Sequence, residues 1–431
     1  MTVLNEQNTM QMLQYIRVFL SKQQDSMLKL LETMVQIESG NTDKAGCDTM
    51  CSLVEGELRA LQVETRRVPM SEKGDFLHGV WGDCYPGAPI LFSGHMDTVF
   101  PKGTLRNIPF RIHDGKAFGP GCLDMKAGLV VAIFALRALQ ESGFCGRPIH
   151  FAFAGDEENG HRASSAAEEY RAAAKPCVAV FNFETGYPND GLVVGRKGSC
   201  RFTVEIDGIA SHAGNAPEKG RSAILEAAHQ VIALQALNDL PRGTSLNVGL
   251  ISGGTCVNAV PDYCRLEVDV RFTSRQHLDA LLEKVKHIIA TPVVRGTHAT
   301  LAVSSINEVM EASQKNLWLF SQVKVASDAI EYPGTLHPIQ VGGWSDANLA
   351  AGMGIPAICA MGACGEGHHT TEEFVTISSL VPRAMLAAAS VLMFQESEQK
   401  RQVHRYECNR NRLQANPDNA FLYGHRCSSF S

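Results

Sequence analysis

Residues 149–160 read IHFAFAGDEENG, an apolar segment that runs directly into three adjacent acids. The apolar half has the length and composition of a buried strand. Adjacent carboxylates raise one another's pKa and cost stability, so Asp156, Glu157 and Glu158 need a local reason to stand together. The segment therefore predicts a strand of the core with a chemically active turn at its carboxyl end.

Two other segments follow the same plan. PILFS at 89–93 leads into His95 and Asp97, and VAVFNF at 178–183 leads into Glu184. In a mostly parallel sheet, ligands bind beyond the carboxyl ends of the strands, so these polar residues are expected to converge. Helical stretches lie between the strands, which favours an α/β catalytic domain built on a mostly parallel sheet. The expected helices cover residues 124–141 and 163–174.

The pattern of the chain changes near residue 195. Strands with alternating apolar residues and two helices follow, in an order that predicts an inserted α+β domain. The expected strands are 200–211, 245–254 and 263–272, and the expected helices are 222–238 and 276–289. We therefore predict a catalytic domain in two parts, 1–194 and 306–396, an insertion at 195–305, and a peripheral tail at 397–431. IPAICAM, 355–361, is expected to be a core strand of the second part.

The composition excludes several classes of function. The chain has 431 residues with 45% hydrophobic and 19% charged residues, as globular proteins do, and its formal net charge of -6 argues against a nucleic-acid partner. Its apolar runs fall well short of the roughly 20 residues that span a bilayer, so no membrane partner is expected. Its 13 cysteines include no CxxC pair, which favours free thiols and a cytoplasmic location.

Nine titratable residues are expected at strand ends or in adjoining loops. They are His95, Asp97, Asp124, Asp156, Glu157, Glu158, Glu184, His368 and His369. Histidine nitrogens and carboxylate oxygens bind zinc, and a catalytic zinc needs only three protein ligands. The surplus indicates two metals that share a carboxylate, together with a base and orienting groups.

Three of these residues allow a structural interpretation. Asp97 is too close to His95 in sequence to share its metal, and it is expected to accept a hydrogen bond from the imidazole and fix its tautomer. Asp124 follows a Gly-Pro-Gly turn at the start of an expected helix, so an N-cap is the alternative to a metal ligand. Asp156 is expected to have a turn or cap function.

Six motifs occur in order between residues 25 and 395. They are GHMDTVFPKG (94–103), GPGCLDMKAGL (119–129), AGDEENG (154–160), FETG (183–186), ASHAGNAPEKGRSAI (210–224) and GHHTTEEFV (367–375). Together they resemble the dinuclear zinc peptidase and amidohydrolase family, which includes carboxypeptidase G-type glutamate carboxypeptidases, acetylornithine deacetylase, succinyl-diaminopimelate desuccinylase and the aminoacylases. TVFPKGT, the GRKGS segment and Glu184 in place of Asp are most similar to the glutamate carboxypeptidase branch.

The resemblance implies two Zn²⁺ per subunit and assigns their ligands. Asp124 would bridge the metals, with His95 and Glu184 completing one site and Glu158 and His369 the other. His368 is the alternative to His369, because the two are adjacent. The resemblance also makes Glu157 the general base for the attacking water, and it implies a cis peptide bond after Asp124.

The insertion resembles the family's lid and dimerisation domain, so a homodimer through residues 195–305 is expected. His212 of the ASHAG motif would reach the other subunit's site and donate to the oxyanion. Asn258 and Arg271 match positions that contact the substrate's carbonyl or carboxylate. For Arg271, an ion pair with Asp269 on its own strand is the alternative.

Gly342 and Gly343 resemble the family's glycine-rich substrate loop. The resemblance as a whole implies a hydrolase that acts on a small peptide or N-acyl amino acid. It would cleave an amide bond next to a free carboxylate and release a C-terminal amino acid. An N-acyl amino acid deacylase is the alternative function. A non-catalytic protein on the same fold would be expected to lack the base or the bridging ligand, and this chain has both.

Overall fold

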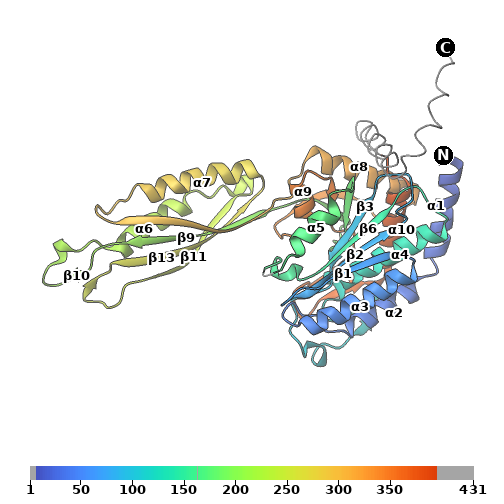
Figure 1. Cartoon of the computed structure of the whole chain (residues 1–431), viewed down its shortest axis with the longest axis horizontal. Helices are drawn as coiled ribbons and strands as arrows, with labels where there is room; N and C mark the ends of the chain where they lie inside the picture. Colours follow the sequence, from blue (N-terminus) through green and yellow to red (C-terminus); the bar gives the residue numbers. More distant parts are fainter. Residues whose placement is uncertain (1–5, 163, 396–431) are drawn as a thin grey trace, which may run out of the picture.

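The structure is a computed structural model that describes residues 6–162 and 164–395. Figure 1 shows two lobes, of which the larger contains α1–α5 and α8–α10 and the smaller contains α6 and α7. No helix within the described ranges combines the length and the apolar character that a transmembrane span needs. The predicted tail, 397–431, lies outside the described residues.

The larger lobe is built on a six-stranded sheet with the order β1-β2-β6-β3-β7-β16. The neighbours β6, β3, β7 and β16 pair in parallel, and β1 and β2 add an antiparallel edge. The residues that follow β3, β6 and β7 therefore emerge at the same edge of the sheet. The strands are β1 (Glu64–Val68), β2 (Gly74–Trp81), β3 (Ile90–His95), β6 (Ile149–Gly155), β7 (Ala179–Asn182) and β16 (Ala357–Ile358).

Alternating side chains divide the core of this lobe into two layers, because successive residues of a strand face opposite sides of the sheet. Phe92 and Phe151 belong to one apolar cluster, and Leu91 and Ala152 belong to the other. The first cluster is covered by α1 (Glu6–Leu20), α2 (Gln24–Val35), α3 (Lys44–Ala60), α4 (Ala127–Glu141), α8 (Gln314–Ala329) and α10 (Leu380–Leu392). The second is covered by α5 (Ala166–Ala174) and α9 (Ala347–Gly352).

Smaller strand pairings connect distant parts of this lobe. One sheet has the order β17-β18-β5-β4, and it brings the loop between β17 and β18 beside the segment that leads into α4. A parallel pair joins β8 and β15. The strands are β4 (Arg111–His113), β5 (Lys116–Phe118), β8 (Gly191–Arg196), β15 (His337–Val341), β17 (Gly365–Glu366) and β18 (Phe374–Thr376).

The smaller lobe has an antiparallel sheet with the order β11-β13-β9-β14, and α6 and α7 pack against it. Its buried side chains, such as Phe202, Leu266 and Leu278, form a cluster of their own. The predicted boundary at residue 305 falls inside β14. The elements are β9 (Gly198–Asp207), β10 (Ser211–His212), β11 (Ser245–Gly253), β12 (Ala259–Val260), β13 (Tyr263–Phe272), β14 (His298–Asn307), α6 (Ala223–Gln235) and α7 (Arg275–Ala290).

Several expected elements differ from the structure in their bounds, as β9 and α6 do at their carboxyl ends, and two of the differences have a clear local cause. The strand expected at 355–361 is limited to β16, because Cys359 pairs with Val193 in an antiparallel bridge and Ala360 turns the chain with a φ of 66°. The helix expected from Asp124 begins at Ala127, since Asp124 has φ -111° and ψ 96°.

Candidate metal centre

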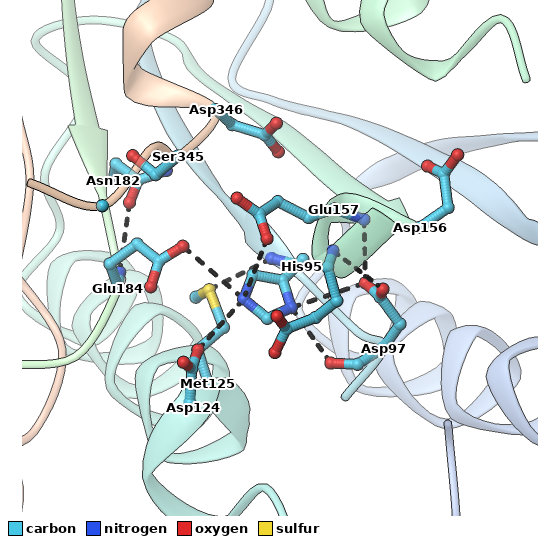
Figure 2. A network of polar contacts seen from close by, with 12 residues as sticks. His95, Asp97, Asp124, Met125, Asp156, Glu157, Asn182, Glu184, Ser345 and Asp346 are labelled. Atoms are coloured by element: carbon cyan, nitrogen blue, oxygen red, sulfur yellow. Dashed lines mark hydrogen bonds and ion pairs between the residues drawn. The ribbon is translucent and has the colours of Figure 1, made fainter. Parts of the chain in front are cut away.

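Five predicted metal ligands lie together at the edge of the six-stranded sheet. They form two groups, His95 with Asp124 and Glu184, and Asp124 with Glu158 and His369, whose ligand atoms within each group lie within 4.8 Å of one another. His95 ends β3, Glu158 follows β6 and Glu184 follows β7, so the parallel strands deliver three of the five. Figure 2 shows Asp124 and Glu184 arranged around the His95 ring.

The distances within the two groups match those between ligands of one metal ion. Nε2 of His95 lies 3.2 Å from Oδ1 of Asp124 and 3.5 Å from Oε1 of Glu184. Nε2 of His369 lies 3.1 Å from Oδ2 of Asp124 and 3.3 Å from Oε2 of Glu158. Two ligands bound at zinc distances in a tetrahedron are about 3.4 Å apart. Asp124 gives a different oxygen to each group, which is the geometry of a bridging ligand.

Asp97 fixes both His95 and the acidic turn. Nδ1 of His95 lies 3.0 Å from the Asp97 carbonyl oxygen, which can only accept, so Nδ1 carries the proton and Nε2 faces the cluster. The Asp97 carboxylate lies 3.4 Å from Nδ1 and accepts the backbone amides of Glu157 and Glu158, each at 3.1 Å. The predicted contact with the imidazole is therefore made mainly by the carbonyl oxygen, while the carboxylate fixes the turn.

Asp124 is not a helix N-cap. Its side chain faces His95 and His369, and its backbone lies in a turn that precedes α4. The peptide bond between Asp124 and Met125 is cis, as the resemblance implied. The alternative reading of Asp124 as a cap is therefore wrong, because the carboxylate is directed into the cluster.

Charge in this cluster favours bound cations. Burial, together with Glu184, Glu158 and Asp346, raises the pKa of Glu157 well above its ordinary value, and burial raises that of Glu158 to about 6. Oε1 of Glu158 is buried without a hydrogen-bond partner among the described residues. Buried carboxylates of this kind need a compensating positive charge, and the imidazole and carboxylate donors present here are those that zinc prefers. The donor set thus fits two metal ions.

His369, rather than its neighbour, contributes to the cluster. The His368 side chain is exposed and its ring packs edge-on against His369 at 5.5 Å. His369 has a φ of 64°, and this backbone turn lets its Nε2 approach Asp124 and Glu158.

A cavity of about 330 Å³ adjoins the acidic turn and is lined by both lobes. Its walls include Glu157 and Glu158 on one side and Arg271 on the other. Nε of Arg271 donates to Asp269 at 2.9 Å, so the alternative ion pair forms and the side chain also reaches the cavity. The full lining is Glu157, Glu158, Asn159, Gly160, Arg162, Ser199, Arg201, Arg271, Asn307 and Trp344.

Other predicted site residues are not joined to this cluster within one chain. His212 lies in β10, which Figure 1 places at the end of the smaller lobe farthest from the six-stranded sheet. Asn258 lies beside it and accepts the backbone amide of Ala213 at 2.9 Å. Gly342 and Gly343 lie in the loop between β15 and α9, where a Cβ atom at Gly342 would meet nothing within 4 Å.

Sequence reasoning missed two groups of supporting residues. Glu373 accepts the backbone amides of Gly121, Leu123 and Asp124, and so fixes the turn of the candidate bridging ligand. The Asp156 carboxylate accepts from His161 and Ser164, which agrees with the expected turn function, and His161 in turn contacts Asp346. Glu373 stands four residues after His369 in a quoted motif, but only the fold brings it to the Asp124 turn.

Known proteins resemble this chain over most of its length. A family model described as Peptidase family M20/M25/M40 matches residues 91–392. Carboxypeptidase G2 from Pseudomonas sp. (strain RS-16) is 31% identical over 378 residues, which cover 86% of this chain and 89% of that protein. Succinyl-diaminopimelate desuccinylase from Dechloromonas aromatica (strain RCB) is 28% identical over 328 residues, covering 66% of this chain and 82% of that protein.

The crystal structure of aminopeptidase PepT from Bacillus cereus ATCC 10987 superimposes with a TM-score of 0.73 and 26% sequence identity. The match covers 86% of this chain and 98% of that one. The ordered motifs, the paired candidate metal groups and these matches agree with one another. The chain therefore belongs to peptidase family M20/M25/M40, a family of metal-dependent hydrolases, and is an enzyme.

Proposed function

We propose that the chain cleaves an amide bond next to a free carboxylate and releases a C-terminal amino acid, as a glutamate carboxypeptidase does. The observation that carries this proposal is the position of Arg271 in the same cavity as Glu157 and Glu158. A substrate in this cavity would present its carboxylate to the arginine and its amide bond to the acidic turn. The similarity to carboxypeptidase G2 supports the same choice.

Arg271 has the free donors that this role requires. Only its Nε takes part in the ion pair with Asp269, and its terminal nitrogens have no partner among the residues that the structure describes. A planar guanidinium group binds both oxygens of a carboxylate through such nitrogens. Arg162 and Arg201 also line the cavity and add positive charge.

Two zinc ions would be held by His95, Asp124, Glu158, Glu184 and His369. When bound, zinc supplies Lewis-acid chemistry, lowering the pKa of water and polarising a carbonyl group. Glu157 is the general base: it takes a proton from the attacking water and passes it to the leaving amine. Its backbone amide is fixed by Asp97, so the carboxylate stays directed toward the candidate metal ligands (Figure 2).

The second candidate function is an N-acyl amino acid deacylase. The similarity to succinyl-diaminopimelate desuccinylase favours it, since the name of that enzyme describes removal of an acyl group. Both functions place a carboxylate on Arg271 and the scissile amide at Glu157. They differ in the group on the acyl side of the scissile bond. The cavity does not restrict that group.

A homodimer would bring His212 to the site. Nδ1 of His212 accepts the backbone amides of Gly214 and Asn215, each at 3.1 Å, so the proton resides on Nε2 and is available as a donor. His212 lies in β10, at the end of the smaller lobe farthest from the candidate metal ligands of its own chain (Figure 1). This donor would therefore serve the partner subunit. In the partner's site it would stabilise the oxyanion, and Asn258 beside it would contact the substrate.

The smaller lobe offers a surface for this dimer, through residues 195–305. Strand β11 is an edge strand in the single chain, and its Leu250 and Ile251 are 63% and 56% exposed. On α6, Leu225 and Ile232 are 52% and 71% exposed. An apolar edge strand beside an apolar helix face is a surface that soluble proteins usually cover.

We propose a cytoplasmic location because the described cysteines are not paired in disulfides. Each cysteine in the described part of the chain is free. Free thiols persist in a reducing compartment.

A panel of substrates tests the proposed function. N-acyl amino acids and peptides with C-terminal glutamate are incubated with the zinc-loaded protein, and the released amino acid is measured. We expect release of glutamate from the peptides with C-terminal glutamate. A preference for the N-acyl amino acids would favour the deacylase. Glu157→Gln should keep the metal content and lose most activity, since it cannot take a proton. A Glu157→Gln enzyme with unchanged kcat would remove Glu157 from the base role.

A further inference from the structure

His161 lies between two buried carboxylates. Its Nδ1 is 2.9 Å from Oδ1 of Asp156, and its Nε2 is 2.5 Å from Oδ1 of Asp346. The side chains of His161, Asp156 and Asp346 are 2%, 0% and 1% exposed, respectively. With both carboxylates ionised, both ring nitrogens donate and the ring is an imidazolium. Burial acts to raise the pKa of Asp346, and the positive charge and hydrogen bond of His161 oppose that shift. Burial alone would lower the pKa of His161, but Asp346 and Asp156 raise it well above its ordinary value.

This bridge joins two segments that form the site. Asp156 opens the turn that carries Glu157, and the backbone amide of His161 closes that turn on the Asp156 carbonyl oxygen at 3.3 Å. Asp346 ends the loop that carries Trp344, which lines the cavity with Glu157. The His161 and Trp344 rings also pack edge to face, with centroids 5.8 Å apart.

Asp346 depends on His161 for its position. Its second oxygen, Oδ2, is buried and has no hydrogen-bond partner in the described ranges, so the bond to His161 is what orients the carboxylate. Figure 2 shows the Asp346 side chain beside that of Glu157. Without the His161 bridge, the carboxylates of Asp156 and Asp346 would lie close together as like charges. Nothing would fix their separation, and they would move apart.

We propose that His161 is a positioning residue for the reaction: it clamps the turn of Glu157 to the loop of Trp344 and Asp346, and so sets the placement of the general base. This inference rests on the proposed function, and it assigns a role in that reaction to His161, which is not a candidate metal ligand. Because a displacement of about 1 Å at a reacting group can cost on the order of 100-fold in rate, loss of the clamp should lower kcat.

The test compares His161→Phe with Ser164→Ala in the zinc-loaded protein. Phenylalanine keeps the ring but removes both N–H donors. Ser164 is a matched control, because its hydroxyl donates to the other oxygen of Asp156 and its removal leaves the bridge intact. His161→Phe should lower kcat about 10- to 100-fold with KM within about threefold and with the zinc content of the parent. Ser164→Ala should keep the parent kcat.

Other outcomes overturn the inference in distinct ways. A His161→Phe enzyme with parental kcat, or one that loses zinc and kcat together, would show that the bridge does not position the base. Nitrogen-15 NMR of the imidazole groups, with His161 assigned by its absence from the variant, should show two protonated ring nitrogens; a neutral ring would overturn the bridge itself. If the parent protein hydrolyses nothing in the panel, the proposed function fails, and the NMR result still decides the bridge.

Discussion

Glu373 gives the clearest test of how the chain builds the candidate metal centre. The residue is 2% exposed, and its two carboxylate oxygens accept three backbone amides of the Asp124 turn: Leu123 at 2.7 Å, Asp124 at 2.9 Å and Gly121 at 3.1 Å. Burial raises the pKa of Glu373 to about 7, while these amides act to lower it. The residue thus forms a buried socket for the backbone of the candidate bridging ligand.

The cost of removing this socket follows from the three amides. A buried N–H that loses its partner costs about 1 to 3 kcal/mol. Glu373→Ala leaves space that water can enter, so we expect the low end for each amide and a total of about 3 to 4 kcal/mol in the free energy of unfolding. Residues that orient metal ligands typically change metal affinity by about 10- to 100-fold, and the zinc affinity should fall by a similar factor.

Urea unfolding and competition of zinc with a chelator measure the two effects. Glu372→Ala is the matched control, because Glu372 is the preceding acid in the chain and its side chain is exposed. Glu373→Gln should lie between the two, since its carbonyl oxygen keeps the amides of Leu123 and Asp124 while its amide group opposes that of Gly121. If Glu373→Ala unfolds and binds zinc as Glu372→Ala does, the socket has no role and the reasoning is refuted.

Three further predictions concern other parts of the molecule. Burial alone would raise the pKa of Asp75, but Lys44, the Met70 amide and Arg67 lower it below 3.8. The stabilisation by the Asp75 carboxylate is therefore present above about pH 4 and is lost as the pH falls through the folded-state pKa. Asp75→Asn should lower the free energy of unfolding by about 2 kcal/mol at pH 7, and the variant and the parent should be equally stable in acid. A difference in urea unfolding that does not change with pH would contradict this. Arg271→Lys should raise KM for the carboxylate substrate about 10-fold with a smaller change in kcat, because lysine cannot bind both oxygens; steady-state kinetics with an unchanged KM would oppose the assignment. Ile232→Asp should convert the proposed dimer to a monomer in light scattering and abolish most activity, whereas an active monomer would remove the need for His212 from a partner.

The residues predicted as metal ligands lie together in the structure, for a physical reason. Apolar runs followed by polar turns at His95, Glu158 and Glu184 are local signals, and parallel pairing places such turns at one edge of a sheet. The choice of His369 over His368 came from motif spacing, and the approach of the His369 Nε2 atom to Asp124 and Glu158 agrees with it. The start of α4 was predicted too early, because no local signal separates an N-cap Asp124 from one whose carboxylate is directed into a cluster.

Residues that support the site were harder to find. The contact of His161 with Asp346 spans 185 positions, and that of Glu373 with Asp124 spans 249. Neither has a periodic pattern, since each depends on how two loops meet after the sheets have formed. The role proposed for His212 also depends on the proposed dimer rather than on one chain. Such long-range polar contacts become visible only in three dimensions.

Asp124 is proposed to bridge two metal ions. The most direct measurement is the zinc content of the protein after metal-replete purification and removal of loosely bound metal, determined by elemental mass spectrometry for the parent and for Asp124→Asn. The parent should hold about two zinc ions per chain, and Asp124→Asn should lose affinity at both sites because each site shares that carboxylate. One zinc or none in the parent, or one site unaffected by Asp124→Asn, would contradict the bridged pair.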